Sequence, residues 1–191
     1  MRIAFLNQKG GVGKTTLVLL LSSVLKRAGY DVAIDDRDPQ GTASVFAAIF
    51  GVPLLSDNPD ADYIITDTPG HLRIEGEVER ELSALIKEAD TLILVAEKSL
   101  ASIHGSAPMA KLINKKKRPK SKAYVLFNQV RIQTMIGKQK GKDLAAKLGL
   151  PALKNELPLS AAFENAFAEG LTAVTGQHRD ELLNLALEIM K

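Results

Sequence analysis

The sequence predicts an α/β fold, doubly wound, in which helices cover both faces of a mainly parallel sheet. Three observations predict it. Short, continuous apolar runs recur along the chain and are typical of strands that are buried on both faces. Segments with helical periodicity alternate with these runs, and glycine follows several of them, where it can end a helix. With 191 residues, 46% of them hydrophobic, the chain is expected to form one domain over residues 1–191.

Each expected element follows from its local pattern. The expected strands are residues 2–7, 31–36, 63–67, 91–96 and 123–128, with a sixth, weaker candidate at 152–157. The expected helices are residues 14–28, 42–50, 75–88, 102–114, 138–148, 160–169 and 179–190. Four of these helices are followed directly by glycine, at Gly29, Gly51, Gly149 and Gly170. The sequence shows no internal repeat and no long linker.

A glycine-rich turn joins the first expected strand to the first expected helix. It consists of Lys9, Gly10, Gly11, Val12, Gly13, Lys14, Thr15 and Thr16. Such a turn directs backbone N–H groups at one point, which suits a phosphate group. Lys14 can reach the β- and γ-phosphates, and Thr15 can offer its hydroxyl to Mg²⁺. The usual pattern begins with glycine at the position of Gln8, and here a second lysine heads the loop. We therefore expect a P-loop NTPase with a Rossmann-like sheet, and a chance glycine turn is the weaker interpretation.

Carboxylates follow two of the expected strands. Ligands of open parallel sheets bind beyond the carboxyl ends of the strands, so these acids are expected beside the phosphate loop. Asp67 is interpreted as the Walker B acid that holds a Mg²⁺-bound water, and Asp38 as the group that orients the attacking water. Asp36 fits either role, and the expected metal site consists of Thr15, Asp36, Asp38 and Asp67. The alternative for a lone aspartate at a strand end is a helix cap or a turn, and it is stronger for Asp35 and Asp36.

Three motifs, at residues 7–16, 36–41 and 67–69, resemble the ParA family of deviant Walker ATPases. These proteins partition plasmids and chromosomes and position other cargo, and MinD belongs to the same superfamily. The resemblance covers most of the chain, in order. It is to the compact type, in which no helix-turn-helix precedes the phosphate loop. It also implies that Asn128, at a strand end, contacts adenine and that Pro158 lies beside the base.

The resemblance implies a mechanism. Two subunits face each other as an ATP-dependent homodimer, with ATP and Mg²⁺ between them. Lys9 reaches the partner's phosphates while Lys14 acts in its own subunit, so that Lys9, Lys14 and Asp38 form the catalytic set. Residues 42–55 would form a switch that follows the nucleotide state. A ParB-like centromere-binding adaptor protein is the partner expected to stimulate hydrolysis.

The charge of the chain is unevenly distributed. The net charge is only +3, yet residues 111–147 contain twelve Lys or Arg and a single acid, Asp143. This balance indicates a polyanionic partner, with a solvated surface as the alternative, and the family resemblance implies that the partner is double-stranded DNA, bound nonspecifically. The expected contacts are Lys115, Lys116, Lys117, Arg118, Lys120 and Lys122. A second cluster of cations follows Asn128. Few aromatic residues lie among them, so base stacking is not expected.

Composition excludes several classes. The chain has no cysteine, which rules out disulfides, a thiolate nucleophile and Cys-ligated clusters. His71, His104 and His178 lack the spacing of metal ligands. The helix expected at 179–190 is acidic on its polar side and lacks aromatic residues, so we expect no membrane binding. The family resemblance implies a cytoplasmic, nucleoid-associated protein. Two alternatives stay open: a MinD-like membrane-cycling ATPase and a nucleotide-dependent scaffold with little turnover.

Overall fold

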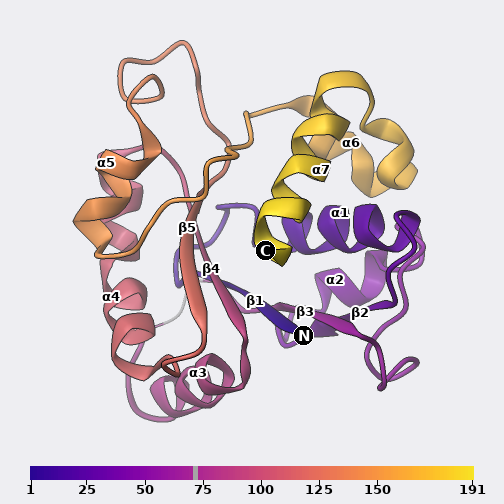
Figure 1. Cartoon of the computed structure of the whole chain (residues 1–191), viewed down its shortest axis with the longest axis horizontal. Helices are drawn as coiled ribbons and strands as arrows, with labels where there is room; N and C mark the ends of the chain where they lie inside the picture. The colour runs from indigo at the N-terminus through magenta and orange to yellow at the C-terminus, as the bar shows by residue number, and fades with distance from the viewer. Residues whose placement is uncertain (71–72) are drawn as a thin grey trace.

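A computed structural model describes residues 1–70 and 73–191. Its centre is a sheet of five parallel strands in the order β2-β3-β1-β4-β5, which confirms the predicted fold class (Figure 1). The strands are β1 (Arg2–Leu6), β2 (Val32–Asp36), β3 (Tyr63–Asp67), β4 (Thr91–Ala96) and β5 (Lys122–Phe127). Each lies within one residue of its predicted bounds.

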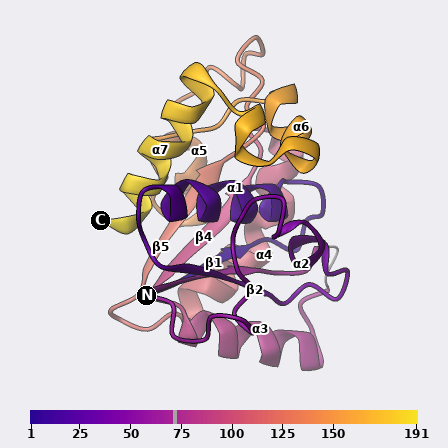
Figure 2. The same ribbon diagram turned by 90° about the vertical axis from the view of Figure 1, so that its right-hand side faces the viewer.

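Helices cover both faces of this sheet. They are α1 (Lys14–Arg27), α2 (Thr42–Phe46), α3 (Gly76–Glu88), α4 (Leu100–Lys116), α5 (Gly141–Ala145), α6 (Ala161–Glu169) and α7 (Gly176–Met190), with 3₁₀ turns at Ala146–Leu148 and Gly170–Ala173. Figure 2 shows α1, α6 and α7 on one side of the sheet and α3 on the other. No helix in the described part of the chain is long and apolar enough to cross a bilayer.

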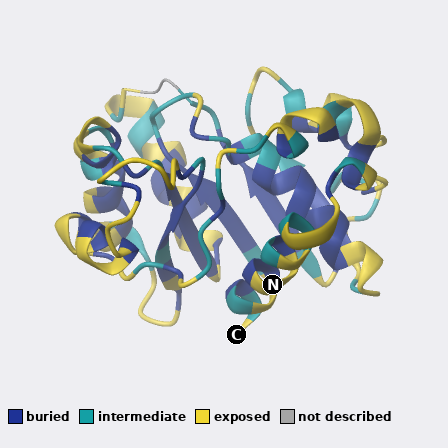
Figure 3. Cartoon of the chain, turned by 90° about the horizontal axis from the view of Figure 1, so that it is seen from above, coloured by how far each residue is buried: buried dark blue, intermediate teal, exposed yellow. Residues whose placement is uncertain are grey.

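The core consists of two layers that share the strands. Along β1, Ile3 and Phe5 pack with α1 and α7, whereas Ala4 and Leu6 pack with α3 and α4. Successive side chains of a strand point to opposite faces, so a strand covered on both sides is apolar throughout. Figure 3 shows the buried sheet at the centre and the exposed outer surfaces of the helices. The continuous apolar runs of the sequence therefore reflect burial of both faces.

The sixth predicted strand, at 152–157, is wrong. This segment makes only isolated bridges to the sheet region, at Ala152 and Pro158. Between them, the N–H groups of Lys154 and Asn155 donate to the carboxylate of Glu188 on α7, at 2.7 and 3.0 Å. A side chain 33 or more residues away thus takes the donors that a strand ladder would need.

Several helix bounds also differ from prediction. The helix predicted at 42–50 ends at Phe46 and continues as turns, and the one predicted at 138–148 begins only at Gly141. Helix α4 begins earlier than predicted because the Ser99 hydroxyl accepts a hydrogen bond from the N–H of Ser102, at 3.0 Å. This is a capping arrangement. The last turn of α4 contains Lys115 and Lys116, so part of the predicted DNA-binding segment is helical.

Candidate nucleotide-binding site

The phosphate loop depends on glycine backbone geometry. Gly11 and Gly13 have φ of 77° and 88°, in the left-handed region that side chains disfavour. A Cβ on Gly13 would also clash with Nδ2 of Asn128. The loop therefore requires glycine at position 13, directly before the first residue of α1.

Two amide side chains that directly follow β5 bind backbone carbonyls of the phosphate loop. Nδ2 of Asn128 donates to the carbonyl of Val12 at 2.9 Å, and Nε2 of Gln129 donates to the carbonyl of Gly11 at 3.0 Å. Gln129 has φ of 54°, which is uncommon for a residue with a side chain and marks a constrained site. Sequence reasoning identified Asn128 but missed Gln129, whose signal was a second amide directly after the strand.

The head of the loop is held by Asn7. Its Oδ1 accepts the N–H of Lys9 at 3.0 Å, while its Nδ2 donates to the carbonyl of Val95 and to Oγ of Ser106, both at 2.7 Å. Asn7 is fully buried. Buried amides of this kind fix the loop because each lost hydrogen bond would leave an unsatisfied polar group.

Lys14, Thr15 and Asp67 meet at the N-terminus of α1. Lys14 is only 6% exposed, and burial lowers the pKa of its ammonium while Asp67 and Asp38 oppose the shift. The Thr15 hydroxyl donates to Oδ2 of Asp67 at 2.7 Å. Burial raises the pKa of Asp67 to about 6, and the Thr15 hydrogen bond and the Lys14 charge only partly offset this. A nearly buried cation with no ion-pair partner in the described part of the chain suits a polyanionic ligand.

The two acids after β2 have different surroundings. The carboxylate of Asp36 accepts hydrogen bonds from the N–H and Oγ of Ser44, at 2.7 and 2.8 Å, and from the N–H of Asp38. Asp36 therefore anchors the start of α2, which is the capping role that the sequence left open. Asp38 accepts a hydrogen bond from the N–H of Gln40 and lines the same cavity as the phosphate loop.

These acids do not form a metal cage by themselves. Among residues 1–70 and 73–191, no group of three or more His, Cys, Asp or Glu gathers closely enough to hold a metal ion. Mg²⁺ usually keeps several waters and uses one or two carboxylates with the phosphates of its substrate. Thr15 and Asp67, which already contact each other, fit that sparse donor set. His71 lies outside the described residues.

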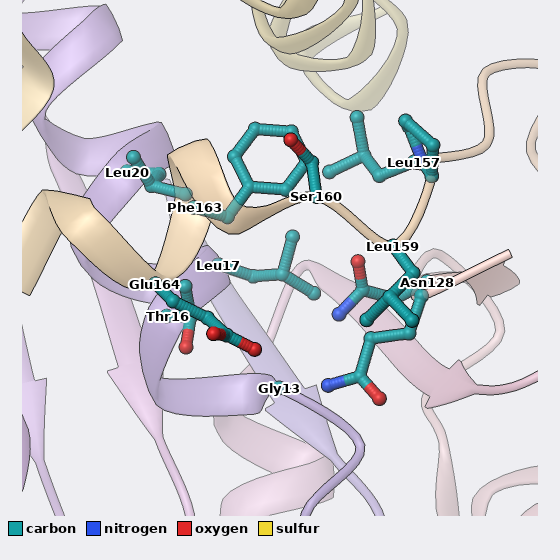
Figure 4. Close-up of a pocket in the computed structure, with 12 residues that line it drawn as sticks. Gly13, Thr16, Leu17, Leu20, Asn128, Leu157, Leu159, Ser160, Phe163 and Glu164 are labelled. Carbon is teal, nitrogen blue, oxygen red and sulfur yellow. The ribbon is translucent and has the colours of Figure 1, made fainter. Parts of the chain in front are cut away.

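Two cavities adjoin the loop. The first, of about 310 Å³, is lined by Gly10, Gly11, Gly13, Lys14, Thr15, Thr16, Asp38, Gly70 and Gln129. The second is more apolar and lies between α1 and α6, with Asn128 and Pro158 in its wall (Figure 4). The structure thus brings together the two residues that the family resemblance implies for the base. The second cavity is narrow, about 50 Å³, so a purine requires its walls to move apart.

Lys9 lies apart from both cavities. Its ammonium is 2.7 Å from Oε2 of Glu97, which directly follows β4. The Lys9 side chain is 35% exposed. Lys14 is therefore buried at the phosphate loop, whereas Lys9 is partly exposed and bound to Glu97.

Ten of the twelve cations of residues 111–147 fall into two groups at opposite ends of the strands, and Lys111 and Lys147 belong to neither group. Residues 115–122 connect the end of α4 to the start of β5, at the amino edge, away from the phosphate loop (Figure 1). Two of them have partners there: Arg118 pairs with Asp90 at 2.8 Å, and Lys122 donates to the backbone oxygen of Lys191. The second group follows β5 at the carboxyl edge. It consists of Arg131, Lys138, Lys140 and Lys142, all exposed.

The parallel sheet, the glycine-rich loop, the buried Lys14 and the Thr15–Asp67 hydrogen bond define a P-loop nucleotide-binding protein with an additional lysine at the head of the loop. The family model described as the CobQ/CobB/MinD/ParA nucleotide binding domain matches residues 3–173, and the chain belongs to this family. It is an ATPase of the ParA/MinD type that uses ATP and Mg²⁺.

Known relatives resemble the chain over different lengths. The maintenance of carboxysome distribution protein A of Halothiobacillus neapolitanus is 27% identical over 190 residues, covering 89% of this chain and 85% of that protein. The chromosome-partitioning ATPase Soj of Thermus thermophilus is 56% identical, but only over 43 residues, or 22% of this chain and 17% of Soj.

Among solved structures, the MinD cell division protein of Aquifex aeolicus has a TM-score of 0.74 at 18% identity. That match covers 99% of this chain and 96% of MinD. The structure of Cyanothece McdA in complex with ATP also has a TM-score of 0.74, at 14% identity, with 99% and 95% coverage. At these identities the two structures support the fold alone.

Proposed function

We propose that this chain is a partitioning ATPase whose ATP-bound homodimer binds double-stranded DNA without sequence specificity. Hydrolysis, stimulated by a ParB-like adaptor protein, would release the dimer and with it the DNA. The observation that carries the proposal is the position of Lys9. It heads the phosphate loop, yet its ammonium lies outside its own phosphate cavity and is bound to Glu97 at the surface.

Lys9 explains why the dimer depends on ATP. Two copies that face each other across their phosphate loops bring two cations together, which is unfavourable without a counter-charge. Each triphosphate supplies that counter-charge to the partner's Lys9. A cation placed beside the γ-phosphate also stabilises the charge that develops during transfer.

Hydrolysis requires a group that orients water. Asp38 lines the phosphate cavity with Lys14, and we assign this role to it. Thr15 and Asp67 would hold Mg²⁺, which would supply neutralisation of the phosphate charge. Asp36 acts indirectly in this proposal, since its hydrogen bonds to Ser44 couple the segment containing Asp38 to α2.

The DNA surface is assigned to exposed cations. Lysine and arginine neutralise phosphates and release counterions, which gives affinity without sequence specificity. The cations at 115–122 are one candidate. The second group, at 131–142, follows β5, so it lies at the carboxyl ends of the strands, as the phosphate loop does. It is therefore better placed to respond to ATP. We therefore propose that both contribute and that the second group carries the ATP dependence.

A second candidate function is the positioning of a protein cargo on the nucleoid. The carboxysome distribution protein matches over 89% of this chain, whereas the match to Soj is local. The same dimer and DNA surface would serve both functions, and only the adaptor and cargo differ.

The direct test is a phosphate-release assay with Mg²⁺-ATP, with and without double-stranded DNA, beside DNA binding in ATP and in ADP. The proposal expects slow turnover and DNA binding that is stronger in ATP and falls steeply with salt. If the chain in ATP co-sediments with anionic vesicles and does not bind DNA, that result would support the MinD-like alternative instead. DNA-independent assembly without phosphate release would support the scaffold.

A further inference from the structure

The two cavities beside the phosphate loop share part of their walls. Gly13, Thr16 and Gln129 line both the phosphate cavity and the narrow apolar cavity. A nucleotide whose triphosphate occupies the first cavity and whose base enters the second must cross this shared boundary. The sugar of such a nucleotide would lie beside the shared residues Thr16 and Gln129.

One carboxylate is directed at this boundary. Glu164, on α6, lines the apolar cavity together with Thr16, and Figure 4 shows both residues on the side of the cavity opposite Asn128. Glu164 is exposed. Within the described residues, 1–70 and 73–191, its side chain forms no ion pair and no hydrogen bond. It is the only acid that lines this cavity in the described part of the chain.

An unpaired carboxylate beside a triphosphate site raises an electrostatic problem. Two negative groups repel each other, so Glu164 weakens nucleotide binding unless it accepts hydrogen bonds from the ligand. A ribose offers two neighbouring hydroxyl donors, and a carboxylate has two oxygens that accept them. Hydrogen bonds to an ionised acceptor are the stronger kind.

We propose that Glu164 accepts hydrogen bonds from the 2′- and 3′-hydroxyls of the bound nucleotide and makes the site selective for ribonucleotides over deoxyribonucleotides. The proposal rests on nucleotide binding at this site. The base then occupies the far wall, where Asn128, Leu157 and Pro158 lie. Glu164 is thus a specificity-determining residue that the phosphate-loop motifs do not include.

If Glu164 had only a structural role, a different experimental result would be expected. The residue lies in the first turn of α6, where a negative charge also favours the helix. Glu169, near the end of the same helix, is likewise exposed but lines neither cavity, so it provides a matched control. A structural role would affect all nucleotides equally, whereas a ribose contact changes the ratio between them.

The test is calorimetric titration of the full chain with Mg²⁺-ADP, its 2′-deoxy and 3′-deoxy analogues, and inosine diphosphate. Wild type is expected to bind ADP about tenfold more tightly than either deoxy analogue, as for a charged hydrogen bond. In Glu164→Ala, which has no side-chain acceptor, this ratio is expected to fall to about twofold or less, while Glu169→Ala keeps the wild-type ratio.

The outcomes separate the claims. Equal binding of ADP and both deoxy analogues by wild type overturns the ribose assignment and leaves the ATPase assignment intact. A preference that persists in Glu164→Ala, or a change only in the ratio of ADP to inosine diphosphate, also overturns it. A chain that binds none of the four nucleotides overturns both assignments.

Discussion

The ammonium of Lys9 and the carboxylate of Glu97 are 2.7 Å apart. The next residue, Lys98, binds a different loop, the one that follows β5. Nζ of Lys98 pairs with Glu156 at 2.6 Å and donates to the carbonyl of Gln139 at 2.6 Å. Two consecutive residues after β4 therefore bind the lysine that we assign to the dimer and the loop that contains the second group of cations. The proposed dimer interface and DNA surface are connected through this short segment.

The first prediction concerns Glu97. Lys9 must leave this carboxylate to reach a partner, so Glu97→Gln is expected to strengthen ATP-dependent dimerisation. The pair is about one-third exposed, and such pairs contribute up to about 1 kcal/mol each. Because both subunits give up one pair on dimerisation, the dimer is expected to be tighter by up to about 2 kcal/mol, or up to roughly 30-fold. Sedimentation velocity over a range of protein concentrations in ATP measures it, with Glu77→Gln as an exposed control. An unchanged or weaker dimer would contradict the resting role of Glu97.

The second prediction separates the two lysines of the loop. Lys9→Ala is expected to bind nucleotide but to remain monomeric in ATP, because the partner's phosphates lose their cation. Lys14→Ala is expected to lose most nucleotide affinity, because Lys14 lies in its own phosphate cavity. Titration calorimetry and sedimentation distinguish the two effects. A Lys9→Ala chain that dimerises in ATP like wild type would refute the assignment.

The third prediction concerns Asp38. Asp38→Ala is expected to bind ATP and dimerise, while its turnover falls by about 10²-fold or more, as when a group that positions water is lost. Phosphate release, measured under conditions in which wild type turns over, provides the test. Wild-type turnover in this variant would remove Asp38 from the mechanism.

The fourth prediction concerns pH. Burial raises the pKa of Asp67 to about 6, above the value of about 3.9 expected in the unfolded chain. The folded protein therefore holds this proton more tightly, so the contribution of Asp67 to stability is complete below about pH 4 and is lost as the pH rises to about 6. Two pKa units correspond to roughly 3 kcal/mol.

Denaturant unfolding of the nucleotide-free protein between pH 4 and 7.5 measures this effect. Relative to Asp67→Asn, wild type is expected to lose stability between about pH 4 and pH 6 and to change little above that. Asp60→Asn, an exposed substitution, controls for general charge effects. A stability difference that does not vary with pH would contradict the raised pKa. Protons are also expected to compete with Mg²⁺ at this carboxylate below about pH 6.

The fifth prediction compares the two groups of cations. Replacing Arg131, Lys138 and Lys140 by Glu is expected to abolish the difference in DNA affinity between ATP and ADP and to reduce the salt slope by about three. Replacing Lys115, Lys116 and Lys120 by Glu is expected to lower affinity in both nucleotide states. Fluorescence anisotropy with unrelated duplexes measures both sets. An ATP response that survives the first set of substitutions would exclude the second group as its source.

Much of the fold was predictable because burial of both sheet faces leaves a plain signal in the sequence. The apolar run at 91–96 becomes the fully buried β4 without a change of bounds. The weak candidate at 152–157 failed because the donors of Lys154 and Asn155 bind Glu188, a contact that no local pattern encodes.

The candidate site was predictable only in part. The loop and its strand-end acids follow a motif with fixed spacing, so Lys14, Thr15 and Asp67 were identified and lie together. The Lys9–Glu97 pair was missed because its members are 88 residues apart and meet only through the order of strands in the sheet. Glu164 was missed for the same reason, since its significance arises only when α6 packs beside α1.

The most direct measurement of the central claim is the distance from Nζ of Lys9 to the nucleotide in a crystal structure of Asp38→Ala with Mg²⁺-ATP. The account predicts a dimer in which each Lys9 has left Glu97 and lies about 3 Å from a phosphate oxygen bound by the partner subunit. A dimer in which Lys9 remains on Glu97, or contacts only its own subunit's nucleotide, would contradict it.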